Sequence, residues 1–384
     1  MKIRSIHPGD SKKLELIKKK FGFINENMIP EQTIYLLSEL NSTQTNILAK
    51  IRGQNQLNSR LIAGGKKEYL VVRKSFEADS ENLHKSAMED SELAGFFEKI
   101  LTQNTMKREP RWEFNGRALD FNDGPFIMGI LNVTPDSFSD GGKYLNREKA
   151  LEHALKMVDD GADILDIGGE STRPGAVSVS AGEEIERVIP LIDEVRKQSD
   201  TILSIDTYKS EVAEAALKAG AHMINDISGG TFDKNMGRVA GDAGCPMVVM
   251  HIKGTPKNMQ KNPYYEDVIE EIYDYFWDRI KVLNRQNVTK IIIDPGIGFG
   301  KRLEDNLTII KDLKDFEYLT CPVMIGLSRK SFLGQITGKD TAHRLAGTQA
   351  ANYAALESGA NILRVHDVTE TKDLVSVFKY LRDV

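Results

Sequence analysis

The chain has 384 residues, of which 40% are hydrophobic, so it is long enough to bury a large core and to hold more than one folded unit. Its net charge of -5 is mild and its basic residues do not gather in long runs, which argues against a nucleic-acid-binding protein. The sequence shows no signal peptide and no apolar run of membrane-spanning length, and its two cysteines are not spaced as metal ligands, so we expect a cytoplasmic protein.

Residues 1–105 predict a small α+β domain. Its helical patterns lie at 12–20, 31–40 and 78–101, and two strand-like segments lie at 60–63 and 68–73. Gly64 and Gly65 separate those two segments, which predicts a hairpin. No catalytic motif stands out here, and the role of the domain is not evident from its residues. A polar stretch that ends at Pro110 is expected to link it to the rest of the chain.

Residues 112–121 predict a second β-hairpin, at the start of a larger domain that covers 111–384. The pair Asn115-Gly116 favours the tight turn of a two-residue hairpin loop, and the flanking residues alternate in polarity. Because this hairpin comes directly before the first strongly apolar strand, we expect it to close the bottom of the domain and to play a structural role.

Eight short apolar runs follow, most of them ending in a polar or charged residue. They are 126–132, 164–166, 202–206, 223–226, 247–251, 291–294, 323–326 and 362–366. Continuous apolar runs are typical of strands buried on both faces, and their spacing leaves room for crossover helices. The clearest helical patterns are 147–160, 181–198, 210–219, 267–285 and 369–382. Eight such units over about 270 residues match a closed (β/α)8 TIM barrel, whose active site lies in the loops after the strands.

The acidic residues that end three strands are candidates for a ligand site at the barrel mouth. Each of Asp166, Asp206 and Asp294 alone could be a helix N-cap. Together with the asparagines, lysine, arginines and histidine on the same rim, they are too many for capping. Buried carboxylates need donors or a cation, and a flat heterocycle with an N–H and NH2 edge would satisfy them in pairs.

A second group of polar residues suits a phosphate. Arg364 and His366 are two apart on one strand, hence on one face, at the end of the barrel where phosphates are commonly held. Asn132, at the end of the first strand, could supply an oxygen to Mg2+, which keeps several waters and binds ligand phosphates. The loops after the first two strands, 134–142 and 168–175, are rich in glycine and polar groups and could close over a second substrate.

Eight motifs, in order over about residues 111–384, carry a resemblance to a known family. They are NVTPDSFSDGG (132–142), GGESTRPGA (168–176), SIDTYK (204–209), INDISGG (224–230), MHIKGTPKNMQ (250–260), DPGIGFGK (294–301), SRKSFLG (328–334) and RVHDV (364–368). Together they resemble the dihydropteroate synthases, which lack the N-terminal extension in their compact members. The resemblance implies a pterin-binding barrel that joins a dihydropterin pyrophosphate to p-aminobenzoate and releases pyrophosphate in folate synthesis, with Mg2+.

The resemblance also implies a role for individual residues. The residues expected to bind the pterin are Asp206, Asn225, Asp294 and Lys330. Those expected around the pyrophosphate and Mg2+ are Asn132, Arg364 and His366, with Asn132 as the metal ligand. Those expected to bind p-aminobenzoate are Phe138, Thr172, Arg173, Pro174 and Ser331. The residues expected to be catalytic are Asp140, which orders the first loop, Lys330, Arg364 and His366. The family mechanism is a dissociative substitution, and the resemblance suggests a homodimer through the late barrel helices.

Two other functions fit part of the pattern. A methyltransferase that moves a methyl group from a methylated folate to a corrinoid protein would share the acids of the pterin pocket. It needs neither a pyrophosphate site nor a p-aminobenzoate pocket, whereas the motifs for both are present. A pterin-binding protein without activity would be expected to lose loop residues such as Asp140, Thr172 or Arg173, and the chain retains all three.

Overall fold

A computed structural model of the chain describes residues 2–6, 34–38, 40–52, 58–61, 67–72, 90–91, 93–94, 111–133, 143–171 and 178–382. The chain divides into two compact units, one of Met1–Arg108 with Asp315–Thr320 and one of Glu109–Lys314 with Cys321–Val384. None of the helices described is long and apolar enough to span a membrane.

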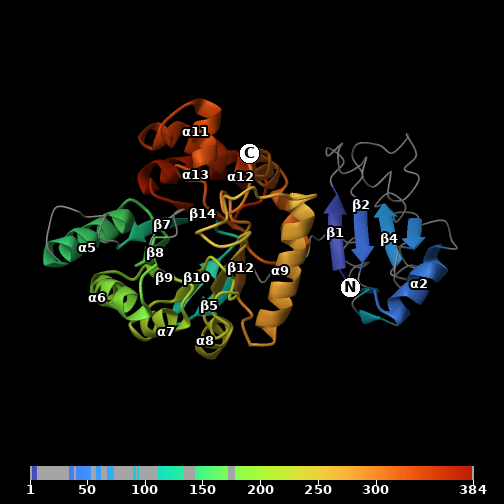
Figure 1. The fold of residues 1–384 in the computed structure, drawn as a ribbon, viewed down its shortest axis with the longest axis horizontal. Coiled ribbons are helices and arrows are strands. Elements are labelled where there is room, and N and C mark those ends of the chain that lie inside the picture. The colour runs from blue at the N-terminus through green and yellow to red at the C-terminus, as the bar shows by residue number, and fades with distance from the viewer. Residues whose placement is uncertain are drawn as a thin grey trace. The chain divides into compact units, whose positions relative to one another are not determined.

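The described part of the first unit is an antiparallel sheet with a helix, α2 (Ser42–Arg52). The sheet has the order β1-β2-β4-β3, with β1 (Lys2–Ile6), β2 (Ile34–Ser38), β3 (Asn58–Leu61) and β4 (Lys67–Val72) (Figure 1). The pairing of β3 with β4 confirms the predicted hairpin.

The helix expected over residues 31–40 is wrong, because β2 occupies this segment. β2 pairs with β1 on one side and β4 on the other, so its backbone groups are bonded across the sheet. A short apolar segment fits a helix or a strand equally well, and the neighbouring strands decide between them. The helix expected at 12–20 lies outside the described residues, and of 78–101 only 90–91 and 93–94 are described.

Within the described residues, the second unit is a barrel of eight parallel strands surrounded by helices (Figure 1), as the sequence predicts. The strands are β7 (Phe126–Asn132), β8 (Ile164–Gly168), β9 (Ile202–Asp206), β10 (Met223–Asp226), β11 (Met247–Met250), β12 (Ile291–Asp294), β13 (Met324–Ile325) and β14 (Ile362–Val365). Their order is β12-β11-β10-β9-β8-β7-β14-β13, and a bridge between Ile293 and Val323 connects the two ends. Every residue of β8, β10, β11 and β12 is buried, which explains their uninterrupted apolar sequences.

The helices of this unit include the five that the sequence predicts, with ends that differ by a few residues. These are α5 (Lys143–Asp159), α6 (Ala181–Gln198), α7 (Ser210–Lys218), α9 (Val268–Asn284) and α13 (Val368–Arg382). The sequence did not predict α8 (Met236–Ala243), α10 (Leu303–Lys311), α11 (Ser331–Thr337) and α12 (Leu345–Glu357), nor the 3₁₀ helices η3 (Leu313–Leu319) and η4 (Thr341–His343). α8, α10 and α11 are short, with 8, 9 and 7 residues, and the longer α12 is apolar around most of its circumference, so none of the four has a clear helical pattern.

The hairpin predicted before the first barrel strand is confirmed as β5 (Arg111–Phe114) and β6 (Arg117–Asp120). Asn115 and Gly116 between them have φ angles of 46° and 73°, the positive values that a type I′ turn requires. Trp112, Phe114 and Leu119 form one core with a residue from each barrel strand: Met128, Ile164, Ile202, Met223, Val248, Ile292, Met324 and Ile362. These strand residues lie toward the strand N-termini, so the hairpin closes the bottom of the barrel.

Candidate active site

The C-terminal ends of the barrel strands bring most of the predicted pterin and pyrophosphate residues around one cavity. Parallel strands end at the same side of a barrel, which is why residues far apart in the chain meet there. The cavity is lined by Ile130, Asp206, Asn225, Ile227, Met250, Asp294, Phe299, Gly326, Ser328, Lys330, Arg364 and His366. Polar groups of both signs therefore share a small space with apolar walls.

Arg364 lies at the centre of the charges in this cavity. Its Nε donates to Asp166 Oδ2 at 2.6 Å, and its NH2 group donates to Asp206 Oδ2 at 2.6 Å. Burial alone would lower the pKa of Arg364, but the carboxylates of Asp166 and Asp206 outweigh that effect and raise it. The guanidinium is thus permanently charged and held in one orientation by two neighbouring strands.

Asp166, one of the three acids expected at the barrel mouth, makes contacts that the sequence did not predict. It is fully buried in β8, where its Oδ2 accepts hydrogen bonds from Arg364 and, at 2.8 Å, from Asn225 Nδ2. Its Oδ1 has no hydrogen-bond partner in the described part of the chain. Because Asn225 donates its amide to Asp166, the oxygen of its side chain is left as an acceptor near the cavity.

Asp206 is the carboxylate whose charge is most sensitive to its surroundings. Burial raises its pKa from 3.8 to about 7; Arg364 opposes that rise and Asp166 adds to it. The Asp166 carboxylate contacts the same guanidinium, so its negative charge disfavours the ionisation of Asp206. A ligand that supplies hydrogen-bond donors to Asp206 would favour its ionised form.

Asp294 and Lys330 form the opposite wall of the cavity. Asp294 ends β12 and its Oδ1 accepts a hydrogen bond from Gly296 N at 2.7 Å, while Oδ2 makes no hydrogen bond within the described residues. Burial raises the pKa of Asp294. Lys330 Nζ donates to Ile297 O at 2.6 Å and lies 4.4 Å from the centre of the Phe299 ring. Burial lowers the pKa of Lys330 to about 8, although Asp294 acts in the opposite direction.

His366 follows β14 and lies beside Ser328. Its Nδ1 is 3.0 Å from Ser328 Oγ, and the same hydroxyl accepts a hydrogen bond from the backbone N–H of His366 at 3.2 Å. Ser328 comes from the loop before α11, so it links the last strand to the segment that carries Lys330. The sequence motif that contains Ser328 was recognised, but its link to His366 was not predicted.

Asn132 ends β7 next to Gly168 and Asp206. A Cβ at Gly168 would lie 3.6 Å from Asn132 Oδ1 and 3.4 Å from Asp206 Cβ, so Gly168 is a close neighbour of both side chains. In the described ranges, no group of three or more His, Cys, Asp and Glu residues could hold a metal ion. Mg2+ does not require such a group, because it commonly takes one or two protein oxygens and completes its shell with water and phosphate. A lone amide oxygen beside a phosphate site fits that pattern.

Most of the residues expected to bind p-aminobenzoate lie outside the described residues, namely Phe138, Thr172, Arg173 and Pro174. The same is true of Asp140, which is expected to order the first loop. Ser331, the described member of this group, is exposed and is the first residue of α11, directly after Lys330.

The base of the second predicted loop is fixed by charges that the sequence did not single out. Tyr208 OH donates to Glu170 Oε1 at 2.7 Å, and Lys209 Nζ forms ion pairs with Glu170 and, at 2.5 Å, with Glu184 Oε2. Glu184 is almost completely buried in α6, so this cluster joins the end of β8 to the helix that follows it.

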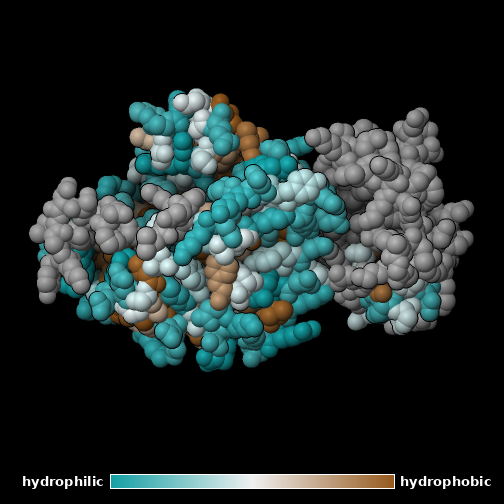
Figure 2. All heavy atoms as spheres, viewed as in Figure 1, coloured by the Kyte–Doolittle hydropathy of each residue, from teal (hydrophilic) through white to brown (hydrophobic). Residues whose placement is uncertain are grey.

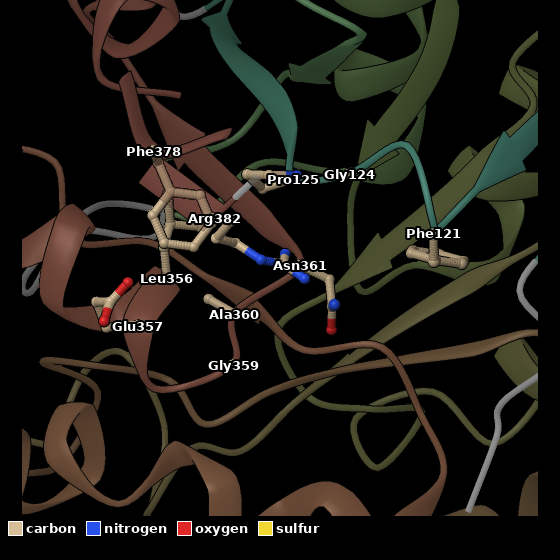
Figure 3. Close-up of a pocket in the computed structure, with 10 residues that line it drawn as sticks. All are labelled: Phe121, Gly124, Pro125, Leu356, Glu357, Gly359, Ala360, Asn361, Phe378 and Arg382. Carbon is tan, nitrogen blue, oxygen red and sulfur yellow. The ribbon is translucent and has the colours of Figure 1, made fainter. Parts of the chain in front are cut away.

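Two larger cavities lie at the other end of the barrel. One, of about 360 Å³, is lined by Phe121 and Pro125 before β7, by Asn361 before β14, and by Phe378 and Arg382 of α13 (Figure 3). The other, of about 570 Å³, includes Ala221 and His222 before β10. Both adjoin strand N-termini, where barrels place stabilising rather than catalytic residues. The mouth is therefore the candidate active site.

Comparisons with known proteins identify the family to which the barrel belongs. Residues 128–366 match the family model described as pterin binding enzyme. The dihydropteroate synthase of Escherichia coli (strain K12) is 42% identical over 264 residues, which is 68% of this chain and 93% of that protein. The structure of Xanthomonas albilineans dihydropteroate synthase with 4-aminobenzoic acid has a TM-score of 0.68 and 42% identity, and the match covers 72% of this chain and 99% of that one. The Xanthomonas albilineans enzyme in complex with 7,8-dihydropteroate has a TM-score of 0.65 and 40% identity, with 72% and 100% covered.

Proposed function

Because the chain belongs to the dihydropteroate synthase family of pterin-binding enzymes, we propose how the residues of its barrel mouth carry out the family reaction. The enzyme is a transferase that condenses a dihydropterin hydroxymethyl pyrophosphate with p-aminobenzoate to give dihydropteroate and pyrophosphate. A corrinoid methyltransferase is not needed to explain any of its features.

The observation that carries the proposed mechanism is the cavity in which Asp206, Asn225 and Asp294 meet Lys330 and Arg364. It combines carboxylate and amide acceptors for the pterin edge with cations for the leaving group. The direct test is incubation of the purified protein with dihydropterin pyrophosphate, p-aminobenzoate and Mg2+, with both products measured. Formation of pyrophosphate without dihydropteroate would exclude the transfer and leave only hydrolysis.

The pterin is held by its donor edge. We assign Asp294 Oδ2 and the Asn225 side-chain oxygen to its N–H and NH2 groups, with Asp206 contributing a further acceptor. Lys330 lies where it can donate to a ring acceptor, because it lines the same cavity as Asp294, and its pKa of about 8 leaves it mostly protonated at neutral pH. Met250, Ile227 and Phe299 supply apolar surface for the faces of the ring.

The pyrophosphate is bound at Arg364 and His366, on one face of the last strand. When bound at Asn132, Mg2+ supplies positive charge to the pyrophosphate oxygens and so makes pyrophosphate a better leaving group. The bond between the pterin methylene carbon and the pyrophosphate oxygen breaks first, and the oxygen keeps the electron pair. Asp206 and Asp294, as ionised carboxylates close to the pterin, favour the transient positive charge on the methylene.

The amine of p-aminobenzoate then attacks the methylene carbon, forms the C–N bond and loses a proton. We assign its binding to Phe138, Thr172, Arg173 and Pro174 with Ser331, and the ordering of the first loop to Asp140. The fixed base of the second loop supports this assignment, since Glu170 is held by Tyr208 and Lys209 immediately before these residues. No covalent bond to the protein is required.

We divide the chain into an accessory domain, 1–105, and the catalytic barrel, 111–384. A protein that begins near Lys107 is expected to retain turnover within about tenfold of the full chain, because every residue assigned here lies between Asn132 and His366. The match to the Escherichia coli enzyme, which covers 93% of that protein with 68% of this chain, supports the division. Steady-state kinetics on the shortened protein provide the measurement, with circular dichroism to check folding. A loss beyond a hundredfold in a folded protein would place the extension in the active site.

We propose that the enzyme is a homodimer that associates through α12 and α13. Val377, Tyr380 and Leu381 on α13 are 58%, 79% and 59% exposed, and Tyr353 on α12 is 36% exposed. In Figure 2, some brown hydrophobic residues lie on the otherwise mostly hydrophilic surface at the top, where α11, α12 and α13 are labelled in Figure 1. Such a patch is typical of a protein interface.

Replacing Val377 by glutamate is expected to convert the dimer to a monomer, because it buries a charge in the interface. Val282→Glu is the matched control, since it makes the same change at a residue that is 38% exposed on α9, a helix that packs against α10. Light scattering after size-exclusion chromatography measures the mass. A monomeric wild-type protein, or dissociation by both substitutions alike, would contradict the assignment.

The cytoplasm is the location we propose. Cys245 and Cys321 are both buried and neither is in a disulfide bond, as expected of thiols in a reducing compartment.

A further inference from the structure

Lys301 is a buried lysine in the loop that follows β12, and the mechanism above does not use it. It is only 5% exposed. Its Nζ donates to Phe299 O at 3.1 Å and His251 O at 3.3 Å, and it lies 3.0 Å from His251 Nδ1. These three acceptors account for the three N–H bonds of an ammonium group, and Lys301 does not line the cavity.

His251 acts as an acceptor in this arrangement. It directly follows β11, and burial lowers its pKa well below the usual value, with Lys301 lowering it further. The ring is therefore neutral and Nδ1 can accept a hydrogen bond from Lys301. The edge of the ring packs against Tyr275, with centroids 5.0 Å apart, and Tyr275 OH donates to Ser228 O and Met250 O at 2.9 Å each.

The loop between Asp294 and Lys301 packs closely against the end of β11. Gly296, Gly298 and Gly300 all have positive φ angles. A Cβ at Gly296 would come within 2.0 Å of His251 O, and one at Gly300 would come within 2.5 Å of Lys253 O. The loop thus has no room to shift toward β11, and Lys301 ties it there by hydrogen bonds.

This loop is also one wall of the active site. The Phe299 ring lines the cavity and lies under the Lys330 ammonium, and Ile297 O accepts a hydrogen bond from the same ammonium. The carbonyl of Phe299 is bonded to Lys301, so a displacement of Lys301 would move the residue whose ring supports Lys330.

We propose that Lys301 is a positioning residue for the pterin site: it fixes the loop 294–301 against His251 so that Phe299 and Ile297 hold Lys330 in place for the dihydropterin. This inference rests on the proposed function and extends it to a residue that does not touch the substrate. The ammonium of Lys301 is buried, and no carboxylate in the described part of the chain is directly bonded to it. Burial lowers the pKa of Lys301 to about 7. The positive charges of Lys330 and Lys253 also lower it, whereas the carboxylates of Asp294 and Asp305 act in the opposite direction.

The decisive experiment is a double-mutant cycle with Lys301→Met and Lys330→Met. Calorimetry with dihydropterin pyrophosphate is expected to show about a tenfold loss of affinity for Lys301→Met alone. In the Lys330→Met background the same substitution should cost less than about twofold, because Lys301 acts through Lys330. Lys311→Met on the exposed side of α10 is the control for removal of a lysine charge. An equal loss in both backgrounds, or no loss in the first, would overturn the proposal.

A substrate-free measurement separates this inference from the proposed function. Hydrogen exchange of amides in 294–301 is expected to accelerate about fivefold or more in Lys301→Met and to stay unchanged in Lys311→Met. His251→Phe, which removes the Nδ1 acceptor and keeps an aromatic ring next to Tyr275, should give a smaller acceleration in the same segment. This variant serves if Lys301→Met does not fold. If exchange is unaffected in the variants that fold, Lys301 does not position the loop, whether or not the wild-type protein binds the pterin.

Discussion

Replacement of Asp294 by asparagine is expected to lower the affinity for the dihydropterin by about a hundredfold. Hydrogen bonds to a charged group contribute about 1.5–3 kcal/mol each, and a paired N–H edge makes two of them. Asparagine keeps an oxygen that can accept from Gly296 N, as Asp294 Oδ1 does now at 2.7 Å. Its NH2 group, however, would face the N–H groups of the pterin, so an attraction is replaced by a repulsion.

Isothermal calorimetry with the pterin substrate measures this effect, and thermal unfolding checks that the variant is folded. Asp294→Ala is the second variant to be measured in the same way. It removes the bond to Gly296 as well, so it should lower stability more than Asp294→Asn does while affecting pterin binding to a similar extent. Pterin affinity within threefold of wild type in a folded Asp294→Asn protein would show that this carboxylate is not the anchor.

Replacement of Arg364 by methionine is expected to abolish most turnover and to lower the free energy of unfolding by about 3–5 kcal/mol. The guanidinium is bonded to Asp166 and Asp206 at 2.6 Å each, and its removal leaves both carboxylates without their cation. Asp166 is the more costly of the two, because it is fully buried and one of its oxygens already lacks a partner in the described part of the chain.

The pH dependence of stability tests whether the Arg364→Met variant is destabilised because its buried carboxylates have lost their cation. The pKa of Asp206 is raised from 3.8 to about 7, so its contribution to stability is full below pH 3.8 and is lost as the pH rises through about 7. In Arg364→Met that loss should be larger, because the opposing cation is gone. Adding Asp166→Asn should recover part of the stability and none of the turnover. Urea unfolding at pH 5 and pH 8 measures the stability of each variant, and steady-state kinetics measure its turnover. A variant equally stable at both pH values would contradict this account.

The sequence predicts the barrel well because strands buried on both faces have a simple sequence pattern, an apolar run that ends at a polar residue. It predicts the bottom hairpin because Asn115-Gly116 suits one turn type with few alternatives. The helix expected at 31–40 is wrong for the opposite reason: five residues of β2 carry little periodic information, and their pairing with β1 and β4 was not visible.

At the site, the sequence supplies residues but not their connections. Arg364, Asp206 and Asn225 were expected near one ligand, yet the buried Asp166 that bonds two of them was considered only as one of several acids. Its position in β8 offers a signal, since Asp166 and Gly168 share a face and Gly168 lies next to Asn132 and Asp206. Lys301 is the last residue of the motif DPGIGFGK, but its contacts could not be predicted, because its acceptors are backbone carbonyls and a histidine that follows another strand.

The closure of the barrel between β12 and β13 has a mechanical consequence. β13 contains only two residues. Within the described residues, its pairing with β12 is a single bridge, which joins Ile293 of β12 to Val323, the residue before β13. Asp294 lies on one side of this short ladder and Lys330 on the other, and the bond from Lys330 to Ile297 O already crosses it. A pterin bound by both residues would therefore bridge the weakly paired junction between β12 and β13. The bound substrate would in this way stabilise the barrel that forms its own site.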